Sequence, residues 1–503
     1  VYLPEDIDTM KGQDILAEDF DMGSFAMCVV ENMSSKDVLD LEEKYKDIEG
    51  VVKVVSANDM IGTTIPKEML PSDVTKQFKK GNSELMLVTF KDSTVAIDAI
   101  TQMREITSDK VVRIGGMSAS TLDTSIVADS EIITYVIVAV ILVLIVLMAS
   151  LDSYVVPFLL LGNIGLAILY NMGSNIFLGQ ISYITKAIAA VLQLGVTTDF
   201  SIFLYHKYEQ AKLKVKTNDE AMTLAIGDTL VSIAGSSLTT IAGFLALCTM
   251  QLTLGSDIGI VMAKGVILGV ISCVTVLPAF ILVFNKAIQK TKHKHLLPDF
   301  KKIPVWITKH YRIFIVLFLL LIGPAAYGQA NTNVYYDLTL SLPESLKSVT
   351  AQNKVADTYD LGSANMILIS SDTKMKDVKD LLSDVNDVKG VKVAMGLESF
   401  LDGSVPDSFI PEDLTSALKS EKHEMLIFMS EYKTGSDEAN AQCNQIEKII
   451  KKYDKSGMLV GEAACTRDLI KITDKDFTVV NSVSIVLVFI IIALVFKSIS
   501  IPI

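Results

Sequence analysis

The sequence predicts a polytopic α-helical membrane protein that carries two repeated extracytoplasmic α+β domains. Three observations predict this fold class: long apolar runs, an internal repeat, and the separation of charged from apolar stretches. Half of the 503 residues are apolar, yet the chain has 58 acidic residues and a net charge of −13. These two facts are compatible when membrane segments and soluble segments alternate along the chain.

Seven runs are long enough, at roughly 20 apolar residues each, to cross a bilayer. Most of them lack a polar face, which distinguishes them from the buried helices of a soluble protein. The runs lie at 132–150, 154–172, 182–205, 229–250, 258–284, 311–330 and 477–496.

An internal repeat relates the two halves of the chain. Gly116, Asp129 and Pro157 recur 345 residues later as Gly461, Asp474 and Pro502. Further upstream the offset is 340 residues and joins Gly50, Pro71 and Glu84 to Gly390, Pro411 and Glu424. One ancestral unit, a soluble domain followed by a membrane span, therefore underlies both halves. Such repeats are typical of many secondary transporters.

The apolar runs and the repeat together divide the chain into six parts. Residues 1–131 and 331–476 form two acidic soluble domains, with 25 acids against 13 bases and 25 against 17. The remaining parts are a five-helix bundle at 132–284, a basic linker at 285–310, a single span at 311–330, and a last span at 477–503 that includes the start of another.

Each soluble domain is predicted to contain two β-α-β units, which indicates a small ferredoxin-like α+β domain. The second domain repeats the pattern of the first. In the first domain the expected elements alternate strand, helix and strand over 25–31, 36–45 and 51–56, and again over 83–90, 93–106 and 111–117.

Lysine and arginine predict the orientation in the membrane. The loop at 206–220 carries four lysines, and the segment 285–312 carries seven lysines and one arginine against a single acid. The positive-inside rule places both in the cytoplasm. Counting spans from there puts both soluble domains on the outer side of a multi-pass protein of the cell membrane.

The ends of the chain indicate a piece of a longer protein. Val1 has no initiator methionine or signal peptide before it, whereas the second copy of this segment, from Ser341, follows a complete apolar run. The chain stops at Ile503, where the first copy begins a new span. We therefore expect one helix to be missing at the front and several at the back.

Asp199 is the leading candidate for a functional residue. It lies about two thirds of the way along the run 182–205, and His206 follows seven residues later, on the order of 10 Å along a helix. A carboxylate at this depth is costly unless it is neutralised or paired, so it usually faces the bundle. Desolvation also favours the uptake and release of a proton. The alternative is a structural aspartate that neighbouring hydroxyl groups satisfy.

Small and hydroxyl residues near Asp199 are candidates to assist it. Thr198 and Ser201 could hydrogen-bond the carboxylate in a proton relay. We expect Asp199 to face neighbouring helices rather than lipid, beside the helix that carries a small, weakly polar flank. Residues that serve either the relay or close helix packing are Gly195, Thr239, Thr240 and Gly243. Lys186 and Lys264 lie near the outer ends of their spans. Two roles are possible for them: the long side chain extends to the membrane surface (snorkelling), or it forms a functional ion pair.

Other chemistries are not indicated. The five cysteines have no CxxC or matched spacing, and the five histidines have no metal-ligand spacing. Neither a P-loop nor a GxSxG motif occurs. The acidic balance argues against nucleic acid as a partner. We therefore expect that the protein is not an enzyme and that it has no catalytic residue, no metal site and no cofactor.

Several segments together resemble the resistance–nodulation–division (RND) superfamily, and within it the MMPL-type (mycobacterial membrane protein large-like) transporters of Gram-positive bacteria. GVTTDFSIFLYHKY, residues 195–208, looks like the fourth-helix motif of that family. Residues 236–247 and 266–282 resemble its fifth and sixth helices, and RIGGMSASTLD and YLPED match its soluble-domain edges. By this resemblance the spans correspond to helices two through eight of twelve, and 132–284 corresponds to the sterol-sensing-like region.

The resemblance implies export of lipids, drugs or other amphipathic molecules, driven by the proton gradient and guided by the soluble porter domains. Asp199 then matches the proton-carrying aspartate of the family. The next residue departs from the pattern, because many members have tyrosine where this chain has Phe200. The expected partners are membrane lipids and the cargo. Whether the protein forms a homo-oligomer does not follow from the sequence.

Two other functions compete with export. A non-transporting sensor or accessory subunit could use the same sterol-sensing-like bundle, and a component that assists protein translocation could share the porter domains and the use of protons. Asp199 separates these functions, because a sensor needs no ionisable group there. The basic motif expected after the fourth helix of a translocation subunit is not evident.

Overall fold

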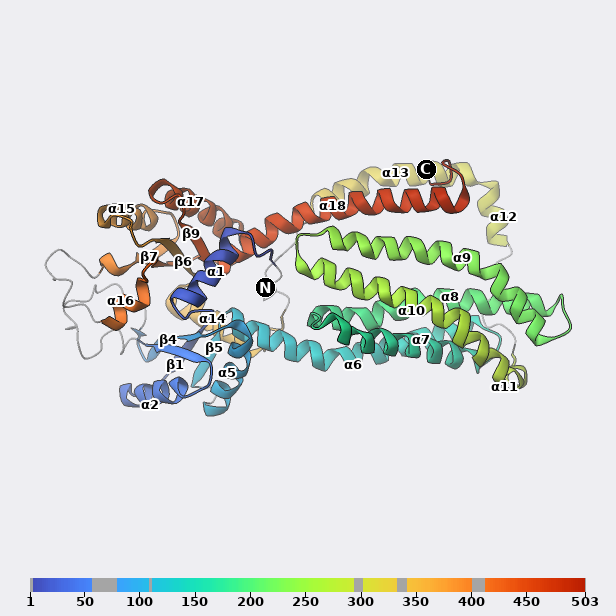
Figure 1. Cartoon of the computed structure of the whole chain (residues 1–503), viewed down its shortest axis with the longest axis horizontal. Helices are drawn as coiled ribbons and strands as arrows, with labels where there is room; N and C mark the ends of the chain where they lie inside the picture. The colour runs from blue at the N-terminus through green and yellow to red at the C-terminus, as the bar shows by residue number, and fades with distance from the viewer. Residues whose placement is uncertain are drawn as a thin grey trace. The chain divides into compact units, whose positions relative to one another are not determined.

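The protein divides into two compact units (Figure 1). The computed structural model describes residues 3–56, 79–107, 111–293, 302–332, 342–399 and 412–502. One unit combines Val1–Val127 with Tyr335–Asp474, and the other combines Ala128–Val334 with Lys475–Ile503. Some residues used in the predictions lie outside the described ranges: Pro71, Pro411, Lys294, His295 and Lys301.

The first sheet of the Val1–Val127 segment has the strand order β2-β4-β1-β5, and the short β3 pairs with β4. All of these pairings are antiparallel. Helix α2 follows β1 and α5 follows β4, so the predicted β-α-β units are confirmed. The elements are β1 (Ser24–Glu31), α2 (Ser35–Lys46), β2 (Val51–Val55), β3 (Lys79–Lys80), β4 (Ser83–Phe90), α5 (Ser93–Ile106) and β5 (Val112–Gly115).

The second sheet repeats the first strand for strand, in the order β7-β8-β6-β9. Even the irregularity is repeated, because the register shifts after Val51 in β2 and after Val391 in β7. The predicted repeat is therefore present in three dimensions. Its elements are β6 (Ser363–Ser370), α15 (Met375–Asn386), β7 (Val391–Met395), η5 (Leu397–Ser399), α16 (Glu412–Leu418), β8 (His423–Ser430), α17 (Asp437–Tyr453) and β9 (Met458–Gly461).

Each sheet is covered on one face by its own two helices. In the first, Cys28 and Val88 of the sheet join Tyr45 of α2 and Ile100 of α5 in one buried cluster. In the second, strands β6 and β8 pack in the same way against α15 and α17. Figure 1 shows α2 and α5 on the outer side of the first sheet and α15 and α17 on the outer side of the second. Apolar residues at helical spacing on α2, such as Val38, Leu41 and Tyr45, give each helix one face that packs on the sheet and explain this layering.

The helix that precedes each sheet packs on the other sheet. Helix α14 (Lys347–Tyr359) contacts β5 and β1, and α1 (Asp8–Asp19) contacts β9. The contact of α1 is close, because a Cβ added at Gly12 would lie 2.3 Å from Cγ2 of Val460. Each α+β domain therefore depends on a helix from the opposite half of the chain.

Each sheet continues into a spanning helix almost without a linker. Only Gly116 separates β5 from α6, and β9 ends at Gly461, the residue before α18. Both glycines have positive φ, +95° and +128°, a backbone conformation that favours glycine at the abrupt change from strand to helix. The predicted strand over 111–117 consequently ends at Gly115, and α6 starts well before its apolar run.

Within the described part of the chain, seven helices are long and apolar enough to cross a membrane. This confirms the predicted number. The seven are α6 (Met117–Ser150), α7 (Val156–Gly173), α8 (Tyr183–Lys212), α9 (Asn218–Ala246), α10 (Thr253–Val283), α13 (Tyr311–Ala330) and α18 (Glu462–Phe496). Two short helices, α11 (Asn285–Lys290) and α12 (Lys302–Lys309), lie between α10 and α13.

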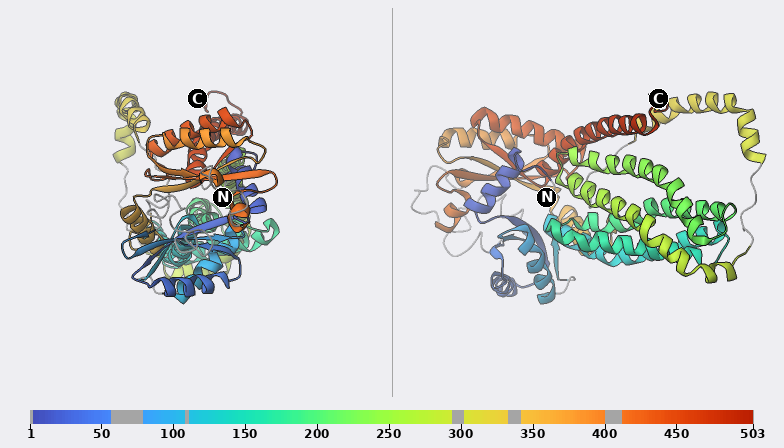
Figure 2. Two further views of the ribbon diagram at one scale, coloured as in Figure 1. Left: turned by 90° about the vertical axis from the view of Figure 1, so that its left-hand side faces the viewer. Right: turned by 45° about the vertical axis from the view of Figure 1, so that its right-hand side comes forward.

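Helices α7, α8, α9 and α10 pack together as a bundle (Figure 2). Glycines bring α10 close to its neighbours. A Cβ at Gly265 would lie 2.6 Å from Nδ2 of Asn171, and one at Gly269 would lie 2.2 Å from Cγ2 of Thr197. Small residues of this kind allow close packing of membrane helices. Helix α10 therefore determines which faces of α7 and α8 are buried.

Candidate functional site

Helix α8, which carries Asp199, is fixed at its start by side-chain hydrogen bonds. Ser182 caps the helix and accepts a hydrogen bond of 3.2 Å from the backbone amide of Ile184. Asp257 of α10 accepts from the amide of Ser182 at 2.7 Å and from the hydroxyl of Thr185 at 2.6 Å. Its 30 residues give a length of about 45 Å, enough to cross a bilayer.

Asp199 lies on an exposed face of α8. Exposed residues recur there at helical spacing: Ile188, Leu192, Gly195, Asp199 and Phe203. We call these five residues the α8 stripe. The prediction that Asp199 packs against neighbouring helices is therefore wrong for the chain that the structure describes. The reason is that α10 approaches α8 on another side, where Gly269 meets Thr197.

Thr198 and Ser201 are buried, and their hydroxyl groups bond to the backbone of α8 itself. The Thr198 hydroxyl donates to the carbonyl of Leu194, and the Ser201 hydroxyl donates to the carbonyl of Thr197 at 3.3 Å. Hydroxyl groups inside a helix commonly bond in this way. The structure thus places these two residues on the bundle side and Asp199 on the α8 stripe.

The small, weakly polar flank of α9 is only partly used in packing. A Cβ at Gly235 would lie 3.2 Å from Val495 of α18. In contrast, no described atom lies within 4 Å of a Cβ placed at Gly195 or Gly243. The half-buried Thr239 and Thr240 both donate to the carbonyl of Ser236, at 2.7 and 3.1 Å. The close approach expected at Gly195 and Gly243 does not occur within the described residues.

A buried polar network joins α7, α8 and α10, and the sequence analysis missed it. Asn171 Nδ2 donates to Gln193 Oε1 at 2.9 Å, and Gln193 Nε2 donates to the carbonyl of Gly265 at 3.1 Å. Lys264 donates to the carbonyl of Asn171 at 3.1 Å and to Oδ1 of Asn175. Uncharged amides inside apolar runs were the available signal, because they need partners there.

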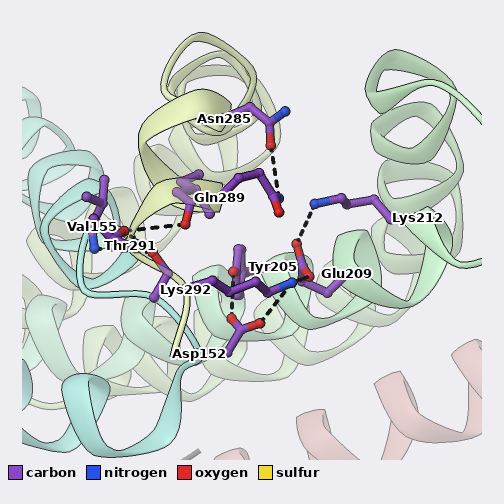
Figure 3. Close-up of polar contacts among 11 residues, drawn as sticks. Asp152, Val155, Tyr205, Glu209, Lys212, Asn285, Gln289, Thr291 and Lys292 are labelled. Carbon is purple, nitrogen blue, oxygen red and sulfur yellow. Dashed lines mark hydrogen bonds and ion pairs between the residues drawn. The ribbon is translucent and has the colours of Figure 1, made fainter. Parts of the chain in front are cut away.

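A second polar cluster lies at the other end of α8 and is drawn in Figure 3. Asp152, in the turn between α6 and α7, accepts from the hydroxyl of Tyr205 at 2.8 Å. Lys292, just after α11, lies 3.2 Å from Asp152 Oδ2 and 2.6 Å from Glu209 Oε2. Glu209 also pairs with Lys212 at 3.0 Å. We call Asp152, Tyr205, Glu209 and Lys292 the α8-end cluster.

Further hydrogen bonds, of the backbone and of side-chain hydroxyl groups, reinforce this cluster. The amide of His293 donates to the carbonyl of Asp152 at 2.8 Å, and the hydroxyls of Ser153 and Thr291 lie 2.9 Å apart. Burial raises the pKa of Asp152, but the hydrogen bond from Tyr205 and the charge of Lys292 outweigh burial and lower the pKa below its usual value. The α6–α7 turn, α8 and the segment after α11 are thereby held together by charge.

Neither cysteine nor metal chemistry is organised in the described residues. Their cysteines are all free, and no group of three or more metal-ligand side chains comes together among them.

Comparison with known proteins identifies the chain's relatives. The family model described as "MMPL family" matches residues 2–310 and 341–503. The chain is 22% identical to the apo-petrobactin exporter of Bacillus anthracis over 511 residues, covering 91% of this chain and 67% of that protein.

Two further relatives match shorter stretches. The chain is 28% identical to the putative membrane protein ActII-3 of Streptomyces coelicolor over 34% of this chain and 24% of that protein. It is 26% identical to the siderophore exporter MmpL5 of Mycobacterium tuberculosis over 31% of this chain and 16% of that protein. Because the family model matches most of the described residues, this chain belongs to the MMPL family.

Proposed function

We propose that the protein is a proton-motive-force-driven exporter of lipids, drugs or other amphipathic molecules across the cytoplasmic membrane. Membership of the MMPL family, relatives named as exporters and seven apolar helices support a multi-pass membrane exporter. The proton drive and the chemical class of the cargo are our proposal. In it the proton gradient takes the place of a bound cofactor, and membrane lipids are partners.

The observation that carries the proton drive is Asp199 in the middle of α8. A carboxylate at this depth is stable only when protonated, hydrated or paired. The α8 stripe around it is apolar apart from Asp199 and is exposed within the described residues. The match covers 67% of the apo-petrobactin exporter, and we propose that the unmatched part supplies helices that cover the stripe and give the carboxylate a polar partner.

Proton binding at Asp199 would then select between two arrangements of the covering helices. The protonated form tolerates an apolar contact, whereas the charged form requires water or a partner, so each arrangement favours one protonation state. We also assign Thr198 and Ser201 to the relay, although they face the bundle and not the α8 stripe, because their hydroxyl oxygens can still accept a hydrogen bond while their protons bond to the backbone. Thr239, Thr240, Gly195 and Gly243 remain candidates for the moving contact.

The orientation of the protein follows from its charges and is likewise part of the proposal. Four lysines in the α8–α9 loop region, Lys207, Lys212, Lys214 and Lys216, favour the cytoplasmic side. Both α+β domains then lie outside the cell and act as porter domains that guide cargo.

The test is cargo efflux from energised vesicles that contain the full-length protein, with and without a protonophore. Asp199→Asn keeps the shape of the side chain but fixes it as neutral, so export should fall to background while insertion and folding persist. The matched control is Asp228→Asn, at an exposed position of the neighbouring helix α9, which should retain export. Full export by Asp199→Asn that the protonophore still abolishes would show that the proton travels elsewhere. Absence of protonophore-sensitive efflux for any amphipathic cargo would favour the sensor.

A further inference from the structure

Two buried glutamates meet in the second α+β domain. Glu424 lies in β8 and is fully buried, and Glu398 lies in η5, directly after β7, with 7% of its surface exposed. Carboxylates are rarely buried to this extent unless something compensates their charge. The site belongs to the α+β domain and is separate from Asp199.

A positively charged side chain is paired with only one of the two glutamates. Glu424 Oε2 lies 2.8 Å from Nζ of Lys419, at the end of α16. Among the described residues, the other oxygen of Glu424, Oε1, has no hydrogen-bond partner, and neither has Oε2 of Glu398. Both are buried acceptors, and an unsatisfied buried acceptor is costly.

Glu398 follows Met395 of β7 by three residues, and Glu424 precedes Ile427, the β8 partner of Met395, by three residues, so the two carboxyl groups are neighbours and can share one proton. A protonated carboxyl supplies the donor that a carboxylate lacks. Two ionised carboxylates at this separation would repel, whereas a pair that shares one proton carries a single charge, which Lys419 balances. A shared proton thus satisfies the hydrogen bonding and the charge together.

We propose that Glu398 and Glu424 bind one proton between them and that its release loosens η5 and the end of α16 from β8. The second α+β domain is thereby a pH-responsive element. The proton holds together segments from three parts of the sequence, since Glu398, Lys419 and Glu424 come from η5, the end of α16 and β8.

The surroundings place the transition near neutral pH. Burial, followed by the hydrogen bond and charge of Glu424, raises the pKa of Glu398 to about 7. The charge of Lys419 lowers the pKa of Glu398 and so opposes this effect. Helix α15 packs against η5 with an apolar face that contains Leu382. Next to Glu424, Nδ1 of His423 lies 2.7 Å from Oδ2 of Asp19 of α1, so a second titratable pair adjoins the site.

The first α+β domain contains a lysine–glutamate pair equivalent to Lys419 and Glu424. Lys79 lies 3.5 Å from the buried Glu84, and both residues precede Lys419 and Glu424 by 340 positions. The lysine–glutamate pair is therefore a property of the repeated unit. The segment that would correspond to η5 lies outside the described residues.

The test is hydrogen exchange of the full chain in nanodiscs between about pH 5 and about pH 9, corrected for the intrinsic dependence of exchange on pH. Exchange in the peptides that cover 391–399 and 412–430 should rise with a midpoint near the pKa of Glu398, about 7. Glu398→Gln supplies a permanent donor, so its exchange should stay slow throughout the range. Glu421→Gln, at an exposed position before β8, should behave as the unmodified protein.

A transition that persists in Glu398→Gln, or its absence from the unmodified protein, would overturn the proposal. If Glu398→Gln does not fold, infrared spectroscopy of the unmodified protein provides the second measurement. A buried protonated carboxyl gives a distinct carbonyl band, which should disappear over the same pH range and shift in Glu398→Asp. A spectrum without a titrating carboxyl band would equally refute the shared proton.

Discussion

The backbone amide of Ser348 donates a hydrogen bond of 2.7 Å to Oδ2 of Asp123, 225 residues earlier in the chain. An equivalent pair of positions is in contact in the other half, where the side-chain hydroxyl of Thr9 donates to Asp468. Thr9 and Ser348 lie near the starts of α1 and α14, and the two aspartates lie near the starts of α6 and α18. The repeat thus preserves the contacts that attach each exchanged helix to the opposite half.

Asp123→Ala should strongly destabilise the unit formed by the two α+β domains. The substitution leaves both the amide of Ser348 and the guanidinium of Arg104 without their buried acceptor, and breaking such a pair costs about 3–5 kcal/mol. Asp129→Ala on the same helix is the control. Its partner Lys186 is at 3.1 Å, but both side chains are more than half exposed, so the cost should be within about 1 kcal/mol. Thermal unfolding of the full chain measures both, and equal effects would contradict the argument.

Gly269→Ala should destabilise the α7–α10 bundle by about 1–3 kcal/mol, because the new methyl group would clash with Cγ2 of Thr197. Thr197→Ser removes that methyl and keeps the hydroxyl, so the double variant should recover most of the loss. Gly165→Ala serves as the control, since a Cβ there meets no described atom within 4 Å. Unfolding in detergent provides the comparison, and a double variant no better than Gly269→Ala would exclude this contact as the cause.

Lys292→Met should release the segment after α11 from α8. It removes the cation that Asp152 and Glu209 share, which leaves Asp152 with the Tyr205 hydroxyl and Glu209 with Lys212 and removes the charge that holds the segment to α8. Hydrogen exchange in residues 284–293 should increase, whereas the exposed Lys290→Met should leave it unchanged. Tyr205→Phe removes one hydrogen bond and should cost about 1 kcal/mol. Unchanged exchange in Lys292→Met would show that the remaining hydrogen bonds hold the segment without the charge of Lys292.

The α8-end cluster should also weaken in acid. The pKa of Asp152 is lowered in the folded protein, so its contribution to stability is present above the pKa of an unfolded aspartate, about 3.8, and is lost as the pH falls through the folded value. Exchange in 284–293, corrected for its intrinsic dependence on pH, should therefore rise only below about pH 3.8, and Asp152→Asn should remove that rise. A rise that survives in Asp152→Asn would assign the acid sensitivity to another group.

Cysteines introduced at Asp47 and Asp387 should react with a membrane-impermeant thiol reagent added from outside, whereas one at Lys290 should be protected. The first two positions are exposed counterparts in the repeat, each at the end of an equivalent helix. Four of the five native cysteines are buried and Cys248 is partly buried, so background labelling should be small. Labelling of Asp47→Cys and Asp387→Cys from opposite sides would contradict the proposed topology.

Hydropathy predicted the seven apolar helices and the location of Asp199 inside one of them, and the repeat predicted the β-α-β units of both soluble domains. They did not predict the side of α8 on which Asp199 lies. That side depends on where the glycines of α10 approach, at Gly265 and Gly269, and this contact is made between residues distant in sequence. Helical periodicity around Asp199 pointed to the wrong side, because the hydroxyl residues Thr197, Thr198 and Ser201 are buried whereas the exposed α8 stripe is apolar apart from Asp199.

The polar clusters were missed for a related reason. Asp152 and Lys292 lie in turns 140 residues apart and come together only when α6–α7 and α11 pack beside α8. Glu398 and Glu424 are separated by 26 residues, and β7 and β8 had to be adjacent for them to meet. Charged residues in turns resemble solvated loops in a sequence, so pairing between them requires the tertiary fold.

The exchange of α1 and α14 also sets an order of events during synthesis. Helix α1 leaves the ribosome about 440 residues before its partner strand β9, a delay on the order of half a minute at bacterial rates. The helices of the bundle are made within that interval, so membrane insertion precedes completion of the domain that α1 covers. Until then the apolar residues of α1, including Leu16, lack their final neighbours. The nascent chain therefore has to be shielded at its beginning until its second half has been made.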